Sequence, residues 1–267
     1  MADAPHDVLI IGAGICGLLA ATSLQNAGRT VQLVDKGRGV GGRMGTRRFA
    51  GGRADHGAQL IYGQHQALQP LLQGWQEAGL IYGTSGRWFP NFSDVAKINL
   101  PMFFGTNGMN SVPKALAASL HVQTGTRITA VSHTNTCWTA TAESGQPFTG
   151  RTLLLTMPVP QALALLADSQ IELTSPIQTT LEAIQYAKCM TGIFHVEGKT
   201  TLPSSGVMAR PNHTFHSVQG IFSSVTARHG AGQRRLQRGA LVSGQSRDAG
   251  CLKRRNGDAP RGKRPSS

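Results

Sequence analysis

A glycine-rich turn between an apolar strand and a helix most constrains how this chain folds. Residues 8–21 read VLIIGAGICGLLAA, and a second apolar run, VQLVD, follows at 31–35. Gly12 permits a tight turn after the strand, Gly14 lets the main chain approach a pyrophosphate, and Gly17 lets the helix pack on the strand. The order of strand, turn, helix and strand predicts a Rossmann-like nucleotide-binding unit, with phosphates at the helix N-terminus.

An acidic residue ends the second strand of this unit. Asp35 lies 18 residues beyond Gly17. A carboxylate at this place can accept hydrogen bonds from the hydroxyl pair of a ribose. Its negative charge would repel a 2′-phosphate, so the pattern favours an unphosphorylated ribose.

The length of the chain limits the number of its domains, and its cysteines indicate its cellular compartment. The 267 residues suffice for one large or two modest domains. The four cysteines have no CxxC spacing, so we expect no metal site, no disulfide framework and a reducing compartment. Asp3 and Asp7 precede the apolar run at 8–21, where a signal peptide would carry positive charge. No other run approaches the roughly 20 apolar residues that span a bilayer, so we expect a soluble protein without membrane contact.

The positive charge is concentrated in the last quarter of the chain. The formal net charge is +13, and residues 205–267 hold 12 Lys and Arg against 2 Asp and Glu. Apolar periodicity also fades there. We therefore expect a folded part at 1–204 and a basic, poorly ordered region at 205–267. A divergent folded end is the alternative, and a sequence out of its ancestral frame is another.

Local patterns predict alternating short elements along the folded part. They place strands at 44–49 and 52–55 in a hairpin, a helix at 65–78, strands at 80–82 and 87–89, a helix at 108–120, strands near 122, at 127–132 and at 138–142, a buried strand at 153–156, a helix through 166, a helix at 175–186 and a strand at 189–196. The last two elements begin a second, substrate-facing layer.

Three glycine-containing segments favour a flavin over a nicotinamide. They are GAGICG at 12–17, DKGRGVGGRM at 35–44 and ADHGAQ at 54–59. In a plain nicotinamide domain the second strand leads to further alternating strands and helices, whereas here it leads into a glycine loop that carries Arg43. A guanidinium beside a pyrophosphate supplies a forked, permanent positive charge.

On these segments the chain resembles the two-dinucleotide-binding-domain flavoproteins, and within them the renalase-like branch of the FAD-dependent amine oxidase superfamily. The matching residues are Gly12, Ala13, Gly14, Gly17, Asp35, Lys36, Gly42, Arg43, Asp55, His56, Gly57, Ala58 and Gln59. GTNGMN at 105–110, RITAV at 127–131 and TMPVPQAL at 156–163 are also similar to segments of that branch. The resemblance covers about residues 1–200.

The resemblance implies an α/β fold, with a Rossmann-like FAD-binding domain and an incomplete α+β substrate domain. It implies FAD as cofactor, with the isoalloxazine near the main chain of 57–59. The residues it implies for cofactor binding are Gly12, Ala13, Gly14, Gly17, Asp35, Lys36, Gly42, Arg43, Ala58, Gln59 and Ile128. The implied reaction passes a hydride from a small amine or dihydronicotinamide to the flavin and then electrons to dioxygen.

No catalytic acid or base is nominated from the sequence. His56 can tune the flavin or serve only as a hydrogen-bonded structural residue, and Asp55 can simply brace its turn. Gln59 and Tyr62 are the side chains expected to face flavin or substrate. The sequence does not indicate an oligomeric state.

The family pattern breaks near the end of the chain. The family has a late Gly-Asp motif before a closing helix whose N-terminus faces the flavin. Residues 239–245 are a faint echo of that helix without a preceding Gly-Asp, and Gly257-Asp258 comes too late, so we interpret both matches as coincidental. An impaired or non-catalytic dinucleotide-binding relative is therefore the main alternative. A nucleic-acid partner for the basic region is less favoured, because only Phe215 and Phe222 could stack on bases there.

Overall fold

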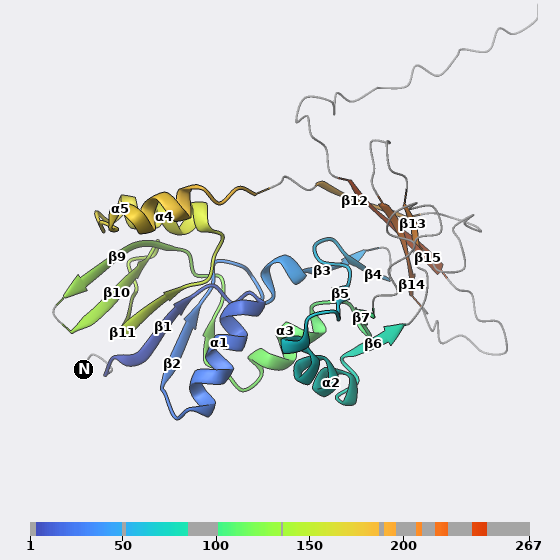
Figure 1. Ribbon diagram of the computed structural model, residues 1–267, viewed down its shortest axis with the longest axis horizontal. Helices are drawn as coiled ribbons and strands as arrows, with labels where there is room; N and C mark the ends of the chain where they lie inside the picture. Colours follow the sequence, from blue (N-terminus) through green and yellow to red (C-terminus); the bar gives the residue numbers. More distant parts are fainter. Residues whose placement is uncertain are drawn as a thin grey trace, which may run out of the picture.

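The structure of the chain is a computed structural model that describes residues 4–49, 52–84, 101–134, 136–186, 190–195, 207–209, 217–223 and 237–244. In these residues a large sheet with helices on both faces forms one end of an elongated molecule, and several smaller sheets form the other end (Figure 1).

The large sheet has six strands in the order β8-β2-β1-β11-β10-β9. Its strands are β1 (His6–Ile11), β2 (Val31–Val34), β8 (Val122–Gln123), β9 (Ile128–Thr134), β10 (Cys137–Ala142) and β11 (Pro147–Leu155). The pairs β8·β2, β2·β1 and β1·β11 are parallel, and β10 and β9 continue as an antiparallel meander. This is a Rossmann-like arrangement, so the predicted fold class is confirmed.

Helices cover both faces of the central strand, which explains its continuous apolar run. On one face, α1 (Ile15–Asn26) packs its Leu18 against Val8 and Ile10 of β1. On the other face, Leu9 and Ile11 pack with Leu165 of α4 (Val159–Asp168). The helix α5 (Ser175–Glu182) lies beside α4 on this second face (Figure 1).

The second region begins with a hairpin and a three-stranded sheet. The hairpin pairs β3 (Thr46–Phe49) with β4 (Gly52–Asp55), and the sheet has the order β5-β7-β6. The remaining bounds here are η1 (Gly42–Met44), β5 (Ile61–Tyr62), η2 (Gln66–Leu68), α2 (Gln69–Glu77), β6 (Ile81–Thr84), β7 (Met102–Gly105) and α3 (Ser111–Ala117).

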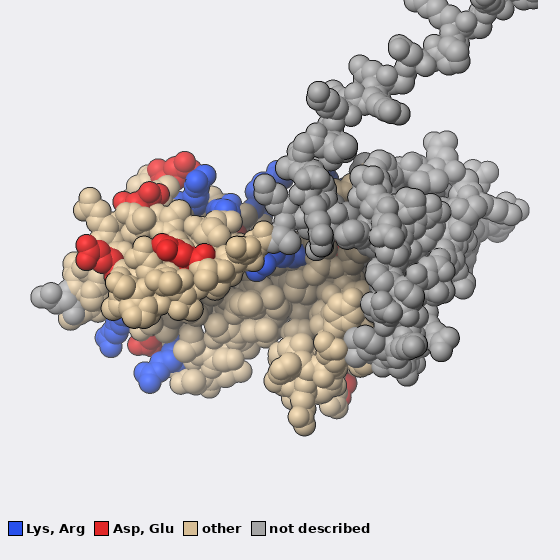
Figure 2. Space-filling model, turned by 45° about the horizontal axis from the view of Figure 1, so that its top comes forward, with Lys and Arg blue, Asp and Glu red and all other residues tan. Residues whose placement is uncertain are grey.

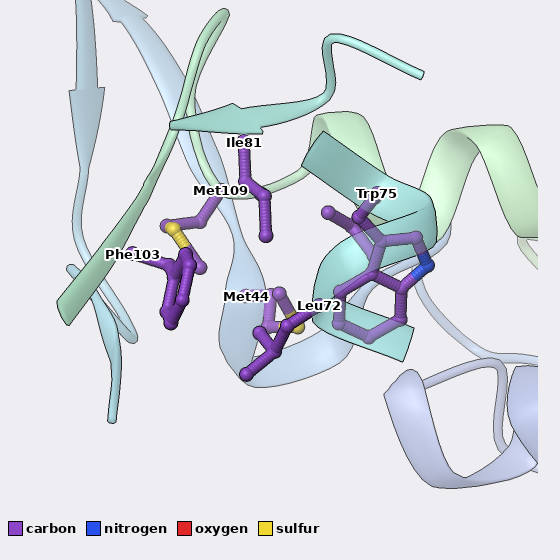
Figure 3. Packing of buried hydrophobic residues seen from close by; sticks show 7 residues of the cluster. Met44, Leu72, Trp75, Ile81, Phe103 and Met109 are labelled. Carbon is purple, nitrogen blue, oxygen red and sulfur yellow. The ribbon is translucent and has the colours of Figure 1, made fainter. Parts of the chain in front are cut away.

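A separate apolar core holds these elements together. Figure 3 shows Leu72 and Trp75 of α2 converging with Met44 of η1. Phe103, Met109 and Ile81 close the same cluster. Because Met44 belongs to the loop that follows β2, this core fixes that loop relative to the large sheet.

A four-stranded antiparallel sheet completes the described residues, in the order β12-β15-β14-β13. Its strands are β12 (Met190–His195), β13 (Val207–Ala209), β14 (Ser217–Ser223) and β15 (Gln237–Gly244). The strand β4 lies against β14 and β15. The boundary that we expected at 204 thus falls between two strands of one sheet. That residues 205–267 can be removed without lowering the stability of the rest of the chain stays a prediction.

Most of the predicted elements occur, and several differ in detail. The helix expected at 175–186 spans Ser175–Glu182. Met44 lies in η1 rather than in a strand. The helix expected at 108–120 spans Ser111–Ala117, because Gly108 adopts a left-handed φ of 92° in the preceding turn. Residues 239–244, the faint echo of a closing helix, belong to strand β15, so they do not form that helix. The strand predicted at 87–89 lies outside the described residues.

The described residues contain neither a membrane-spanning helix nor a metal-binding cluster. None of the helices there combines the length and apolar character needed to cross a membrane. No group of three or more His, Cys, Asp or Glu side chains in the same residues is placed to hold a metal ion.

Candidate functional site

The three glycines of the turn after β1 serve different purposes. Gly12 has a φ of 114°, which favours glycine, and its N–H donates to the carbonyl of Val34 at 2.8 Å. A Cβ on Gly17 would lie 2.0 Å from the carbonyl oxygen of Gly12, so only glycine allows this close packing. A Cβ on Gly14, the N-cap of α1, would meet nothing within 4 Å. Gly14 therefore faces open space, where a pyrophosphate can approach.

A threonine from the far end of β11 supports the turn from behind. The Oγ1 of Thr156 donates to the carbonyl of Gly12 at 2.9 Å and lies 3.2 Å from the carbonyl of Ile11. The N–H of Thr156 also donates to Ile11 at 3.0 Å. These contacts fix the turn at the carboxyl edge of the sheet, where ligands bind in open α/β folds.

The carboxylate of Asp35 joins the end of β2 to the turn. Its Oδ2 accepts the N–H of Ala13 at 2.6 Å, and its Oδ1 accepts the N–H of Gly37 at 2.6 Å. Each carboxylate oxygen retains a further lone pair. Asp35 can thus shape the turn and still accept from ribose hydroxyls.

The loop after β2 folds over the turn. The N–H of Gly41 donates to the carbonyl of Ala13 at 2.8 Å, and Gly41 pairs with Gly14 in an isolated bridge. A Cβ on Gly42 would lie 3.4 Å from the Cα of Gly14. Because Gly41 and Gly42 both have left-handed φ angles, of 113° and 52°, glycine is favoured at both.

The predicted phosphate partner Arg43 follows directly in η1. Its main chain is fixed, since its carbonyl accepts the N–H of Ala58 at 2.8 Å. A Cβ on Gly57 would lie 1.9 Å from that same carbonyl oxygen, so the segment 57–58 packs closely on Arg43. The Arg43 side chain is exposed, and its Cζ lies 6.0 Å from the ring centroid of Tyr186.

Asp55 braces the turn between β4 and the segment 56–59. Its Oδ1 accepts hydrogen bonds from the hydroxyl of Thr46 and from the N–H of Met109, the latter at 2.9 Å. Burial raises the pKa of the Asp55 carboxyl, although these two hydrogen bonds and the neighbouring His56 act in the opposite direction. Both bonds link the motif to the core of the second region, which supports the structural interpretation of Asp55.

His56 and Gln59 differ in exposure and in the contacts that their side chains make. His56 is exposed, its main-chain N–H donates to the carbonyl of Gly45 at 3.2 Å, and its ring would lie 2.9 Å from a Cβ on Gly45. The Nε2 of Gln59 is buried and has no hydrogen-bond partner in the described part of the chain. A buried amide donor without an acceptor is costly, so it indicates a missing polar group nearby. Tyr62 is half exposed on β5.

A cavity of about 290 Å³ opens beside the turn. Its lining residues are Ile11, Gly12, Asp35, Lys36, Thr126, Arg127, Ile128, Thr129, Met157, Gln161, Ala164, Leu165 and Asp168. Four predicted cofactor residues therefore share it: Gly12, Asp35, Lys36 and Ile128. The Nζ of Lys36 donates to the Oε1 of Gln161 at 2.9 Å across the cavity wall.

The structure brings the predicted site residues together in two adjoining places. Gly12, Ala13, Gly14, Gly17, Asp35 and Gly42 form the turn and its cover, with Lys36 and Ile128 in the cavity. Arg43, Ala58 and Gln59 form the neighbouring segment.

On the face shown in Figure 2, several Lys and Arg side chains lie in the middle of the molecule, while Asp and Glu side chains gather over the end with the large sheet.

Sequence reasoning missed Gly41 and Tyr186 as members of this site. Gly41 lies in a run of glycines, so spacing alone did not single it out from its neighbours. Tyr186 has no local motif, because its contacts are with Arg43 and Val159, far away in the sequence. Thr156 belonged to a quoted motif, but its bond to Gly12 was not predicted.

A dinucleotide with a flavin fits these residues on three structural observations. The glycine cradle leaves open space in front of Gly14, the Asp35 carboxylate lies at the edge of the cavity, and Gln59 has a buried donor without an acceptor. Fold and site together define a Rossmann-type dinucleotide-binding protein.

Comparisons with known proteins identify the family. A model of the NAD(P)-binding Rossmann-like domain matches residues 10–75, and a model of flavin-containing amine oxidoreductases matches residues 75–230, more than half of the chain. The chain belongs to the flavin-containing amine oxidoreductase family, whose members are FAD-dependent oxidoreductases.

Individual relatives agree with this assignment. Polyamine oxidase 1 of Oryza sativa subsp. japonica is 38% identical over 86 residues, which are 31% of this chain and 16% of that protein's length. A presumed protoporphyrinogen oxidase from Exiguobacterium sp. 255-15 has a TM-score of 0.62 at 14% identity, with 89% of this chain and 77% of that one covered. An engineered putrescine oxidase has a TM-score of 0.61 at 15% identity, with 89% and 74% covered. At these identities the solved structures show the shared fold.

Proposed function

We propose that this chain is an FAD-dependent oxidase of small amines. The observation that carries the proposal is the assembly of the glycine turn, Asp35 and the glycine loop into one dinucleotide site within a chain of this family. A polyamine oxidase and a putrescine oxidase among the similar proteins support an amine as substrate. The matched stretch spans 16% of the polyamine oxidase, so substrate and activity remain part of the proposal.

The residues of the turn would hold the diphosphate and the adenosine. Free N–H groups at the start of α1 and the Arg43 guanidinium would bind the pyrophosphate. The remaining lone pairs of Asp35 would accept from ribose hydroxyls, and Ile128 would line the adenine part of the cavity. Lys36 shapes that cavity through its bond to Gln161.

The segment 57–59 would receive the isoalloxazine. The N–H of Ala58 is already donated to Arg43, so this group serves the fold of the segment. The buried Nε2 of Gln59 is free to donate to a ring acceptor. When bound, FAD supplies the electron acceptor, which takes a hydride from the substrate and passes two electrons to dioxygen.

Finer assignments extend the same proposal. A dihydronicotinamide, as in the renalase-like branch, is the second substrate class, supported by the sequence segments at 35–44 and 54–59. Dioxygen would be the acceptor, with peroxide as product, and the protein would act in the cytoplasm. No described side chain is assigned as acid or base, since Asp55 is occupied by two hydrogen bonds and His56 contacts Gly45.

The cheapest test is an absorption spectrum of the purified protein with a thermal-shift series. We expect a bound flavin spectrum and stabilisation by FAD but not by NAD. Anaerobic addition of a diamine or polyamine should then bleach the flavin band, and air should restore it. Stabilisation by NAD alone would contradict the flavin assignment.

A non-catalytic dinucleotide-binding role is the second candidate. It is favoured by the departure from the family pattern near the end of the chain, where residues 239–244 form a strand. Bound flavin that neither amines nor dihydronicotinamides bleach would support this role.

A further inference from the structure

We propose that Tyr186 is a positioning residue that orients the Arg43 guanidinium for the pyrophosphate. The inference rests on the proposed binding of FAD and adds a residue from outside every nucleotide-binding motif of the chain.

The starting point is how loosely the Arg43 side chain is otherwise held. Its main chain is fixed in η1 by the hydrogen bond from Ala58. Its side chain is exposed, and no carboxylate among the described residues forms an ion pair with it. A long side chain with a fixed base and a free tip loses much conformational freedom when it binds a ligand.

Tyr186 supplies the contact that the tip lacks. The Cζ of Arg43 lies 6.0 Å from the Tyr186 ring centroid, within the range of a cation–π interaction. An aromatic face holds the plane of a guanidinium without using its N–H donors, so these remain available for phosphate oxygens.

The ring is itself held in place by the site. The hydroxyl of Tyr186 accepts the N–H of Val159 at 3.1 Å, at the first residue of α4. Three residues earlier, Thr156 supports the glycine turn through the carbonyl of Gly12. Tyr186 therefore connects the start of α4, which follows Thr156, with Arg43, which follows the glycine loop after β2.

Two matched substitutions separate the contribution of the Tyr186 ring to FAD binding from that of its hydroxyl. Tyr186→Phe and Tyr186→Leu both remove the bond to Val159, but only Tyr186→Leu removes the aromatic face. Tyr186 is 44% exposed, so both variants are expected to fold, with equal thermal midpoints in the absence of FAD. FAD dissociation constants are measured by titration for both variants, with Arg43 present and with Arg43→Ala.

We expect Tyr186→Leu to raise the Kd for FAD about two- to fivefold, the size of an exposed cation–π contact. Tyr186→Phe should raise the Kd less, because it loses the bond to Val159 but keeps the aromatic face. In the Arg43→Ala background, Tyr186→Leu should have no further effect. Equal Kd values for the two Tyr186 variants, or an undiminished effect without Arg43, would overturn the inference alone. Failure of the unaltered protein to bind FAD would overturn the proposed function together with it.

Discussion

The carboxylate of Asp35 accepts the main-chain N–H of Ala13 at 2.6 Å, across the turn that separates β1 from α1. Its other oxygen accepts the N–H of Gly37 at the same distance. The acidic residue that the sequence assigns to a ribose thus also sets the shape of the turn itself. Any change of this side chain therefore acts on the protein before a nucleotide arrives.

Asp35→Asn should weaken both the fold and the site. The amide has one acceptor oxygen, so one of the two N–H groups would face an NH₂ instead of an acceptor. Leaving such a part-buried donor unpaired costs about 1–3 kcal/mol. We expect a lower midpoint of urea unfolding without FAD, and a higher Kd for FAD. Asp7→Asn is the control, because Asp7 bonds Thr30 at the opposite end of β1. Equal losses of FAD affinity in the two variants would contradict this role of Asp35.

Gly14→Ala and Gly17→Ala should separate ligand binding from folding. The methyl of Gly17→Ala would overlap the carbonyl of Gly12, and overpacking of this kind costs about 1–3 kcal/mol. The methyl of Gly14→Ala meets no protein atom within 4 Å but enters the space before the turn. Thermal unfolding should therefore detect Gly17→Ala, and FAD titration should detect Gly14→Ala at nearly unchanged stability. A destabilised Gly14→Ala that binds FAD normally would refute this division.

Arg43→Ala should reduce FAD affinity far more than Arg38→Ala. Both side chains are exposed on the same loop, so both substitutions remove one positive charge. A lost charge-assisted contact with phosphate costs roughly 1.5–3 kcal/mol, or about tenfold or more in Kd. Similar losses for both variants, abolished by added salt, would mean that the loop attracts FAD by its general charge.

The part-buried carboxyl of Asp55 should make the stability of the protein depend on pH. Burial raises the pKa of this group above its ordinary value of 3.8, so the folded protein retains the proton longer than the unfolded chain. Its contribution to stability is present at low pH and is lost as the pH rises through the folded-state pKa. Both hydrogen bonds to Asp55 use Oδ1, which asparagine retains.

Asp55→Asn should therefore remove this dependence. Thermal midpoints of the two proteins, compared from pH 4 to pH 8, should diverge in favour of Asp55→Asn as the pH rises. A constant difference between the two proteins over that range would show that burial does not perturb this carboxyl in solution.

Removal of residues 205–267 should leave the large sheet folded. All six of its strands end by Leu155, and its two apolar clusters contain no residue beyond Ile171. The truncation removes the strand β15 that pairs with β12, so protection of β12 amides from hydrogen exchange should be lost. Cooperative thermal unfolding of the truncated chain checks the first expectation. Loss of cooperative unfolding in the truncated chain would show that the large sheet needs residues 205–267 to fold.

The sequence predicted the parts of the site that depend on spacing within one strand–turn–helix–strand unit. Gly12, Gly17 and Asp35 have their expected places because their roles follow from backbone geometry over a few tens of residues. The contacts of Thr156 with Gly12 and of Tyr186 with Arg43 join distant segments, and no local periodicity encodes them.

Element ends and the last quarter of the chain were harder to predict for a physical reason. The helix expected from 108 begins at Ser111, because the left-handed Gly108 and the bond from the Ser111 hydroxyl to its carbonyl form a turn first. The segment 239–244 is too short to show a clear period of apolar residues, and its strand conformation depends on pairing with β12 and β14. Pairing partners of that kind are set by the sheet as a whole.

The bond from Thr156 to Gly12 has a consequence for how the molecule is made. The two residues are 144 positions apart, so the turn at the start of the chain obtains its support only after more than half of the chain has left the ribosome. Closing so large a loop is slow, because its entropic cost precedes the contacts that offset it. Until then β1 lacks its neighbour β11, and the face with Leu9 and Ile11 lacks the cover of Leu165. A dinucleotide can therefore meet a supported turn only after residue 156 has been synthesised.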